Sequence, residues 1–282
     1  MERYAVKEIM QEKNGQSYTF PIAVKSGNVI HDPKNPAIPV DGTLSETSKN
    51  PVENRIITKA LKEKANVLTV NRIVYVAQGG SDTEGDGTMA KPYASISHAL
   101  KNVPVINGNY EYTIRVEAGT YGGFTAKNVS ATIELEGDVT IVSTGTYSIE
   151  IDDSNIKING NDNIINLTGA ASSALLYIHN GGRLNLYKTV MKLRGSGEGT
   201  GIYIVSDGGF SHTSGRISFD NLYNAIHVGT NSVFYSDDMY GNVTNGIIAT
   251  AGGRVAYGSS TITATTPVRT SAGGRVYTGE QT

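Results

Sequence analysis

Carboxylates are the first residues to test for chemistry in this sequence, because a glycosidase needs two of them at a fixed separation and a lyase needs a base near a cation. The central part of the chain contains Asp152-Asp153, Asp220 and Asp237-Asp238. Asp152 and Asp153 are consecutive, so in a strand their side chains would point to opposite faces. Any pairing of the other carboxylates depends on how the elements that carry them are stacked.

Tyrosines and arginines near the C-terminus indicate a second kind of chemistry, the binding of sugars and anions. Tyr235, Tyr257 and Tyr277 recur at nearly constant intervals, as do Arg254 and Arg275. Aligned phenol rings could stack against sugar rings, or pack only on one another. Aligned guanidinium groups must face water or share an anion, such as a wall-polymer phosphate or a sugar acid.

Metal and cofactor chemistry have little support in the sequence. The acidic loop Asp82–Gly87 has alternate carboxylates and glycines, as some calcium loops do, but it lacks the closing glutamate of an EF-hand. A solvated turn is the simpler interpretation. His179, His212 and His227 fall at unlike positions, and the chain has no cysteine. We therefore expect no metal site and no cofactor.

The composition excludes other classes of function. The 282 residues carry a formal charge of −2 with a pI near 6.2, so no overall positive field would attract a nucleic acid. No stretch approaches the ~20 apolar residues of a membrane span, and Met1–Met10 has no apolar core of signal-peptide length. We expect a soluble protein made in the cytoplasm. The 33 glycines suit many short strands joined by tight turns.

A repeat predicts the elements that position these side chains. The phrase Gly-Gly-Arg-Val begins at Gly252 and again at Gly273, 21 residues later. Related phrases begin at Gly181, Gly208 and Asn231, which extends the series upstream with spacings of 27, 23, 21 and 21. Apolar and polar residues alternate between the markers, which is strand periodicity. Such a period predicts an all-β chain coiled as a right-handed parallel β-helix, a β-solenoid with one marker in each coil.

Aligning the coils on these markers tests the carboxylates. Asp237 and Asp238 fall where other coils have Ser214-Gly215 and Gly258-Ser259, and Asp220 falls where the next coil has Val243. No two carboxylates stack, so we expect no active site within one chain, although a cleft between subunits could still assemble one. The tyrosines and arginines named above fall nearly into register, which favours binding over catalysis.

The entrance to the repeat region resembles a known family. Residues 74–103 read as a strand, an acidic turn and then a helix that starts at Ser95 and has Ile96, Ala99, Leu100 and Val103 on one face. This order is similar to the start of pectate-lyase-like right-handed β-helix proteins. The resemblance implies a helix that covers the open end of the first coil. It does not imply one activity, because that fold hosts lyases, hydrolases, adhesins and phage spikes.

A segment before the repeat indicates how the chain associates with other chains. Asn50-Pro51 predicts the start of a short helix. Alone in water this helix would be marginal, so its apolar face needs a partner, and self-association is the economical solution. Residues 45–65 also resemble a segment of fibre proteins from tailed bacteriophages, which implies a trimeric linker between a virion anchor and a distal body. The predicted trimerisation residues are Val52, Ile56, Ile57, Ala60 and Leu61.

Three parts follow from these patterns: an N-terminal virion-anchoring domain over 1–40, a linker and trimerisation helix over 41–66, and the β-helix over 67–282. Asn14-Gly15 between two strand-like runs predicts a hairpin in the first part. The whole is expected to be a homotrimeric phage fibre or spike subunit on the virion surface, bound to capsid or tail proteins and attaching to bacterial surface glycans. A polysaccharide depolymerase and a purely structural decoration of head or tail are the alternatives.

Overall fold

The computed structural model describes residues 5–13, 16–25, 28–30, 68–104, 109–143, 145–169 and 174–278. The chain divides into two compact units, Met1–Ala65 and Asn66–Thr282. The predicted trimerisation helix and the proline-containing linker lie outside the described residues.

The N-terminal unit contains a three-stranded antiparallel sheet of β1 (Ala5–Lys13), β2 (Gln16–Lys25) and β3 (Asn28–Ile30). The register of β1 and β2 ends with Lys13 opposite Gln16, on either side of Asn14-Gly15. The predicted hairpin is therefore confirmed.

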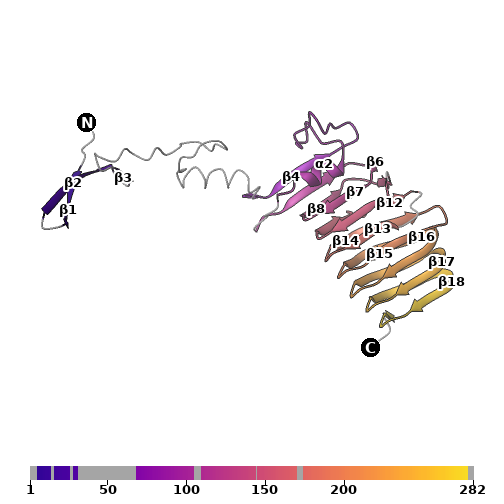
Figure 1. Ribbon diagram of the computed structural model, residues 1–282. Helices are drawn as coiled ribbons and strands as arrows, with labels where there is room; N and C mark the ends of the chain where they lie inside the picture. Colours follow the sequence, from indigo (N-terminus) through magenta and orange to yellow (C-terminus); the bar gives the residue numbers. More distant parts are fainter. Residues whose placement is uncertain are drawn as a thin grey trace. The chain divides into compact units, whose positions relative to one another are not determined.

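The second unit is a parallel β-solenoid, as the repeat predicts, and it has about six turns (Figure 1). Each coil passes through three faces, and each strand pairs with the strands of the coils before and after it. Face 1 consists of β4 (Arg72–Val76), β5 (Tyr112–Val116), β8 (Ser130–Leu135), β11 (Asn155–Asn159), the starts of β14 (Arg183–Arg194), β16 (Gly209–Val228), β17 (Val233–Ala249) and β18 (Arg254–Thr270), and β19 (Arg275–Thr278).

Face 2 consists of β6 (Gly119–Gly122), β9 (Val139–Val142), β12 (Ile164–Thr168), the second half of β14 and the middle parts of β16, β17 and β18. Face 3 consists of β7 (Phe124–Lys127), β10 (Ile149–Asp152), β13 (Ala174–His179), β15 (Thr200–Ile204) and the ends of β16, β17 and β18.

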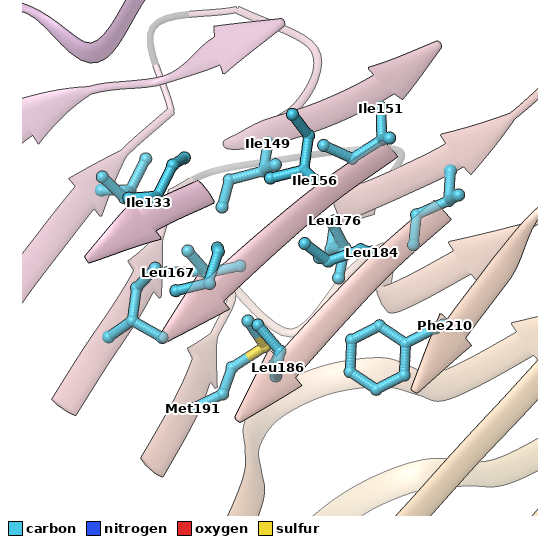
Figure 2. Close-up of a cluster of buried hydrophobic side chains, with 14 of the residues drawn as sticks. Ile133, Ile149, Ile151, Ile156, Leu167, Leu176, Leu184, Leu186, Met191 and Phe210 are labelled. Atoms are coloured by element: carbon cyan, nitrogen blue, oxygen red, sulfur yellow. The ribbon is translucent and has the colours of Figure 1, made fainter. Parts of the chain in front are cut away.

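The core consists of columns of like side chains, because in-register pairing places each inward residue above its counterpart in the previous coil. On face 3, Ile149, Leu176 and Ile202 occupy one such column and are fully buried. Figure 2 shows the same arrangement for Ile156 and Leu184, which are register partners on face 1. Branched aliphatic residues suit this role because they pack well on a pleated surface.

The glycine phrases occupy the corner between face 3 and face 1. Gly252 has φ +79, a left-handed conformation that glycine adopts without strain. A Cβ on Gly253 would lie 2.2 Å from the carbonyl oxygen of Val228 in the coil before, so the second glycine permits close stacking of coils. The marker at Gly208 is misplaced by one residue, which makes the predicted steps on both sides of it wrong. Arg183 pairs with Gly209, not with Phe210, and Gly209 in turn pairs with Val233.

A short helix covers the first coils, as predicted. Helix α2 (Ile96–Lys101) begins after Ser95, whose hydroxyl accepts a hydrogen bond from the His98 N–H at 3.0 Å. Ile96, Ala99 and Leu100 are buried in the core. The helix thus supplies apolar cover at this end of the stack.

Candidate functional site

The predicted binding residues near the C-terminus are only partly brought together. Arg254 and Arg275 are register partners on face 1, and both are exposed. Tyr235 and Tyr277 lie in one outward column with Ala256 between them. Tyr257 lies one position further along its strand and is packed against the core. The three tyrosines therefore do not form one continuous ladder, because a spacing of 21 residues from Tyr235 falls on Ala256; glycan binding there stays a prediction.

The carboxylates considered in the sequence are each engaged separately. Asp237 accepts hydrogen bonds from the Tyr235 hydroxyl at 2.6 Å and the Ser214 N–H at 3.0 Å. Asp238 lies 2.9 Å from the Nε of Arg216. Asp220 pairs with Asn242 across the coils, not with Val243, because the register has already shifted between His212 and Ile217. None of the three has another carboxylate as its register partner.

The acidic loop has a structural role. Asp82 accepts hydrogen bonds from the N–H groups of Ala94 and Ser95, at 2.8 and 3.0 Å, and from the Ser95 hydroxyl at 2.6 Å. It therefore fixes the residue at which α2 starts. Asp86 accepts from the N–H of Thr88 at 2.9 Å. Across the part of the chain that the structure describes, no group of three His, Asp or Glu side chains is placed to hold a metal ion.

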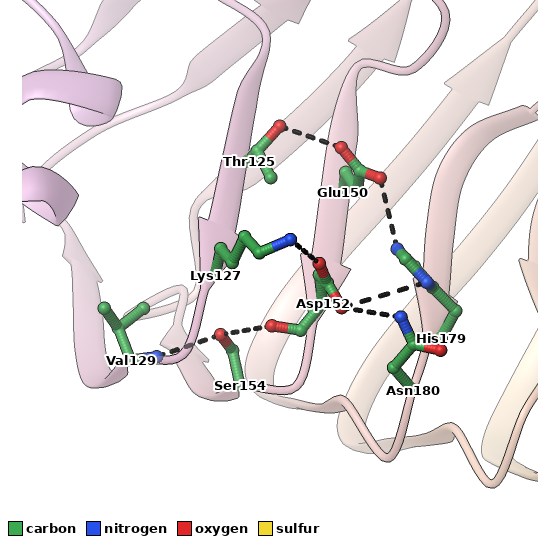
Figure 3. A network of polar contacts seen from close by, with 8 residues as sticks. All are labelled: Thr125, Lys127, Val129, Glu150, Asp152, Ser154, His179 and Asn180. Carbon is green, nitrogen blue, oxygen red and sulfur yellow. Dashed lines mark hydrogen bonds and ion pairs between the residues drawn. The ribbon is translucent and has the colours of Figure 1, made fainter. Parts of the chain in front are cut away.

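Face 3 carries a polar cluster that our sequence reasoning did not find (Figure 3). Lys127, Asp152 and His179 are register partners on three successive coils. The Lys127 ammonium lies 2.7 Å from one oxygen of Asp152, and Asn180 donates to the other at 2.8 Å. The Nδ1 of His179 lies 3.9 Å from that second oxygen. Asp152 thus has a cation or donor at each oxygen.

Glu150 completes the cluster. It lies two residues before Asp152 on β10, so both side chains point outward from face 3. One oxygen of Glu150 accepts from the Thr125 hydroxyl at 2.9 Å, and the other lies 3.1 Å from the Nε2 of His179. Asp153, which we expected to point away from Asp152, has φ 44 and is exposed at the turn. The signal in the sequence was the alternate spacing of Glu150 and Asp152 within a strand.

The two carboxylates of the cluster differ in electrostatics. The ion pair with Lys127, and then the hydrogen bond from Asn180, hold the pKa of Asp152 below its usual value. Only 10% of the Asp152 side chain is exposed, against 26% for Glu150. Asp152 is therefore a buried, ionised anchor for the cluster, whereas Glu150 remains within reach of a ligand.

A ladder of aromatic rings continues from the cluster along face 3. The ring centroids of Tyr147 and Tyr177 are 4.5 Å apart, those of Tyr177 and Tyr203 are 5.5 Å apart, and those of Tyr203 and His227 are 4.8 Å apart. Tyr177, Tyr203 and His227 are register partners on successive coils. The marker alignment missed this ladder, because its 27-residue step places Ile204 rather than Tyr203 beside Tyr177.

A hollow of about 570 Å³ lies where this ladder begins. Tyr147 and Glu150 line it together with residues of α2, β7 and the loop before β10. Tyr147 has Tyr177 of the following coil against one side of its ring, while Thr125 of the preceding coil lines the hollow. The full lining is Ser97, Lys101, Gly123, Phe124, Thr125, Gly145, Thr146, Tyr147 and Glu150.

This arrangement can recognise a polyol. A tyrosine ring offers an apolar face to the C–H groups of a sugar, and a positioned carboxylate accepts hydrogen bonds from hydroxyls. Hydrolysis would need a second carboxyl group that can reach the same bond, and Asp152 is engaged by Lys127 and Asn180. The geometry of face 3 is thus better suited to holding a sugar than to cleaving one.

Comparison with family models, with curated proteins and with solved structures finds no match to this chain. Among the described residues, no helix has the length and apolar character needed to cross a membrane.

Proposed function

We propose that the chain is a subunit of a bacteriophage fibre or spike that attaches to glycans on the bacterial surface. Two features support the setting: the resemblance of residues 45–65 to a phage-fibre linker, and the parallel solenoid that follows it. In this proposal the N-terminal sheet anchors the subunit to capsid or tail proteins, and the solenoid, wound right-handed as in pectate-lyase-like proteins, faces the host.

The observation that carries the binding function is the hollow on face 3. It combines the ring of Tyr147 with the carboxylate of Glu150, which Thr125 and His179 hold in place. A sugar ring on Tyr147 would direct its hydroxyls to Glu150. Because the hollow is lined by one carboxylate, Glu150, and one ammonium, Lys101, it carries no net charge and an uncharged sugar fits it best.

The test is binding of the purified full-length protein to a panel of bacterial capsule and wall polysaccharides, and to cells that carry those that bind. We expect Tyr147→Ala and Glu150→Gln each to weaken binding by at least 10-fold. Tyr187→Ala, which removes a 40% exposed tyrosine from face 1, is the matched control and should bind normally. Equal binding by all three variants would refute a face 3 site.

A depolymerase is the second candidate, because Glu150 and Asp152 point outward from one strand with His179 between them. An adhesin should leave the bound polysaccharide intact. New reducing ends or unsaturated sugars that vanish in Glu150→Gln would establish cleavage. A protein that incorporates into virions but binds no glycan and no cell would instead favour a structural decoration of head or tail.

The trimer is tested separately. The apolar residues between Val52 and Leu61 should bring three chains together, so light scattering should report about three times 30.0 kDa. Ile57→Asp or Leu61→Asp should lower that mass, because a buried unpaired carboxylate opposes association. A monodisperse monomer at micromolar concentration would contradict the fibre interpretation.

A further inference from the structure

A second hollow lies on face 2, away from the cluster and ladder of face 3. Its volume is about 420 Å³, and strands from five successive coils contribute to it. Its lining residues are Thr140, Asn166, Thr168, Lys192, Leu193, Arg194, Ser218, Asp220 and Tyr240. Neither the predicted binding residues nor the face 3 site accounts for this set.

One outward column forms the middle of the hollow. Register pairing places Thr140, Asn166, Lys192, Ser218 and Tyr240 one above another on successive coils. Ser218 is the small residue between the lysine and the tyrosine. The backbones that carry Lys192 and Tyr240 are two rungs apart, about 9.6 Å, and only a hydroxymethyl group fills the space between them.

The charge of the hollow is positive. Asp220 is its only carboxylate, and the Nε of Arg194 lies 3.0 Å from it, so these two charges offset one another. Lys192 has the neutral residues Asn166 and Ser218 as its register neighbours and makes no ion pair within the described part of the chain. Its ammonium is exposed and carries the net charge of the site.

The aromatic side of the hollow differs from the ladder on face 3. Tyr240 is 36% exposed, and its register partners Ser218 and Thr261 are small. It stacks on none of the described aromatic rings, whereas Tyr177 stacks on Tyr147. No described aromatic side chain therefore covers a face of the Tyr240 ring.

From these observations we propose that the face 2 hollow binds one pyranose residue that carries a negative charge. The carboxylate or phosphate accepts hydrogen bonds from Lys192, the ring packs beside Tyr240, and the remaining hydroxyls reach Asn166 and Thr140. A charge-assisted bond is about twice as strong as a neutral one, so the anion dominates the affinity. The inference assigns acidic sugars to face 2. It rests on the proposed function only in taking the sugar to be part of a bacterial surface glycan.

The experiment measures binding of three probes to the full-length protein by calorimetry or NMR. Trigalacturonate carries the carboxylates, its methyl ester has the same rings without charge, and glucose 6-phosphate tests phosphate as the anion. We expect trigalacturonate to bind at least 10-fold more tightly than its ester, and added salt to weaken it. Glucose 6-phosphate binding with the same salt dependence would extend the site to phosphates.

Variants locate the binding. Lys192→Met and Tyr240→Ala should each weaken trigalacturonate binding about 10-fold. Lys157→Met is the matched control, because Lys157 is an exposed lysine on an outward position of β11 on face 1, and it should have no effect. Thermal unfolding confirms that each variant is folded, since all three side chains are exposed.

The proposal is overturned if no charged probe binds at millimolar concentration, if the methyl ester binds as well as the acid, or if Lys157→Met weakens binding as much as Lys192→Met. These failures are distinguishable from failure of the proposed function, because Tyr147→Ala tests neutral glycans on face 3. Loss of binding in Tyr147→Ala with normal trigalacturonate binding would confirm that the two sites are separate.

Discussion

Replacing Phe234 with alanine tests the inward and outward assignment of every strand. Phe234 is fully buried, and its ring stacks on that of Phe210 in the preceding coil, with centroids 4.9 Å apart and an angle of 4° between the planes. Val255 of the following coil closes the other side of the same column. Hydrogen-bonded strands fix the distance between coils, so the surroundings cannot collapse into the space left by the ring.

The expected cost follows from that rigidity. Phe→Ala substitutions in cores cost about 3–5 kcal/mol, and a site that cannot relax falls in the middle or upper part of that range. For the unit Asn66–Thr282, with roughly 2.1 cal/mol/K of unfolding entropy per residue, about 4 kcal/mol lowers Tm by about 9 °C. Scanning calorimetry measures the shift.

Val233→Ala is the control for this experiment. Val233 precedes Phe234 on the same strand but points outward and is 46% exposed. A surface truncation of this kind should change stability by about 0.5 kcal/mol or less. If Phe234→Ala shifts Tm no more than Val233→Ala does, the strand faces have been assigned wrongly and the columns of the core do not exist as described.

Two further predictions concern features inside the coils. Burial lowers the pKa of His212 below its ordinary value near 6.5. The unfolded state therefore binds more protons than the folded state just below that value, and the free energy of unfolding should fall as the pH drops from 7.5 to 5. His212→Leu places a leucine where the preceding coil has Leu186, and it should flatten the dependence of Tm on pH. Gly253→Ala should cost about 1–3 kcal/mol, because its Cβ would lie 2.2 Å from the carbonyl oxygen of Val228. Gly79→Ala, with no atom within 4 Å of the added Cβ, should leave denaturant midpoints unchanged.

The fold could be predicted because every coil of a solenoid places the same requirements on the residues at equivalent positions. Each coil needs a corner with left-handed φ and a close approach to the coil before it, and Gly252-Gly253 and Gly273-Gly274 satisfy both needs in adjacent residues. The alignment was wrong in the coil where a residue other than glycine adopts the left-handed conformation at the corner. There Asp207 has φ 63, so the pair Gly208-Gly209 lies one position further along the coil than the glycine pairs of the other coils.

The candidate site was harder to predict because the coils that carry its residues differ in length. The coils between Tyr112 and Arg183 advance by 19, 25 and 28 residues from one to the next, so no constant period aligns them. Glu150 and Tyr177 become neighbours only through pairing of β10 with β13. Tyr147 reaches the ladder from a loop, and loop conformation is not encoded in strand periodicity.

The stacking within the ladder decides where on face 3 a sugar can be held. Each interior ring has a neighbouring ring on both sides: Tyr177 lies between Tyr147 and Tyr203, with interplanar angles of 23° and 31°, and Tyr203 lies between Tyr177 and His227. These neighbours leave less of an interior ring open to a ligand than is left at the end of the run. Only a terminal ring keeps one face for a ligand. At one end His227 is followed by Ile248 of the next coil, whereas at the other end Tyr147 borders the hollow that Glu150 also lines. Recognition should therefore be concentrated at the start of the ladder beside α2, and lengthening the solenoid would add stability to face 3 without adding sugar sites to it.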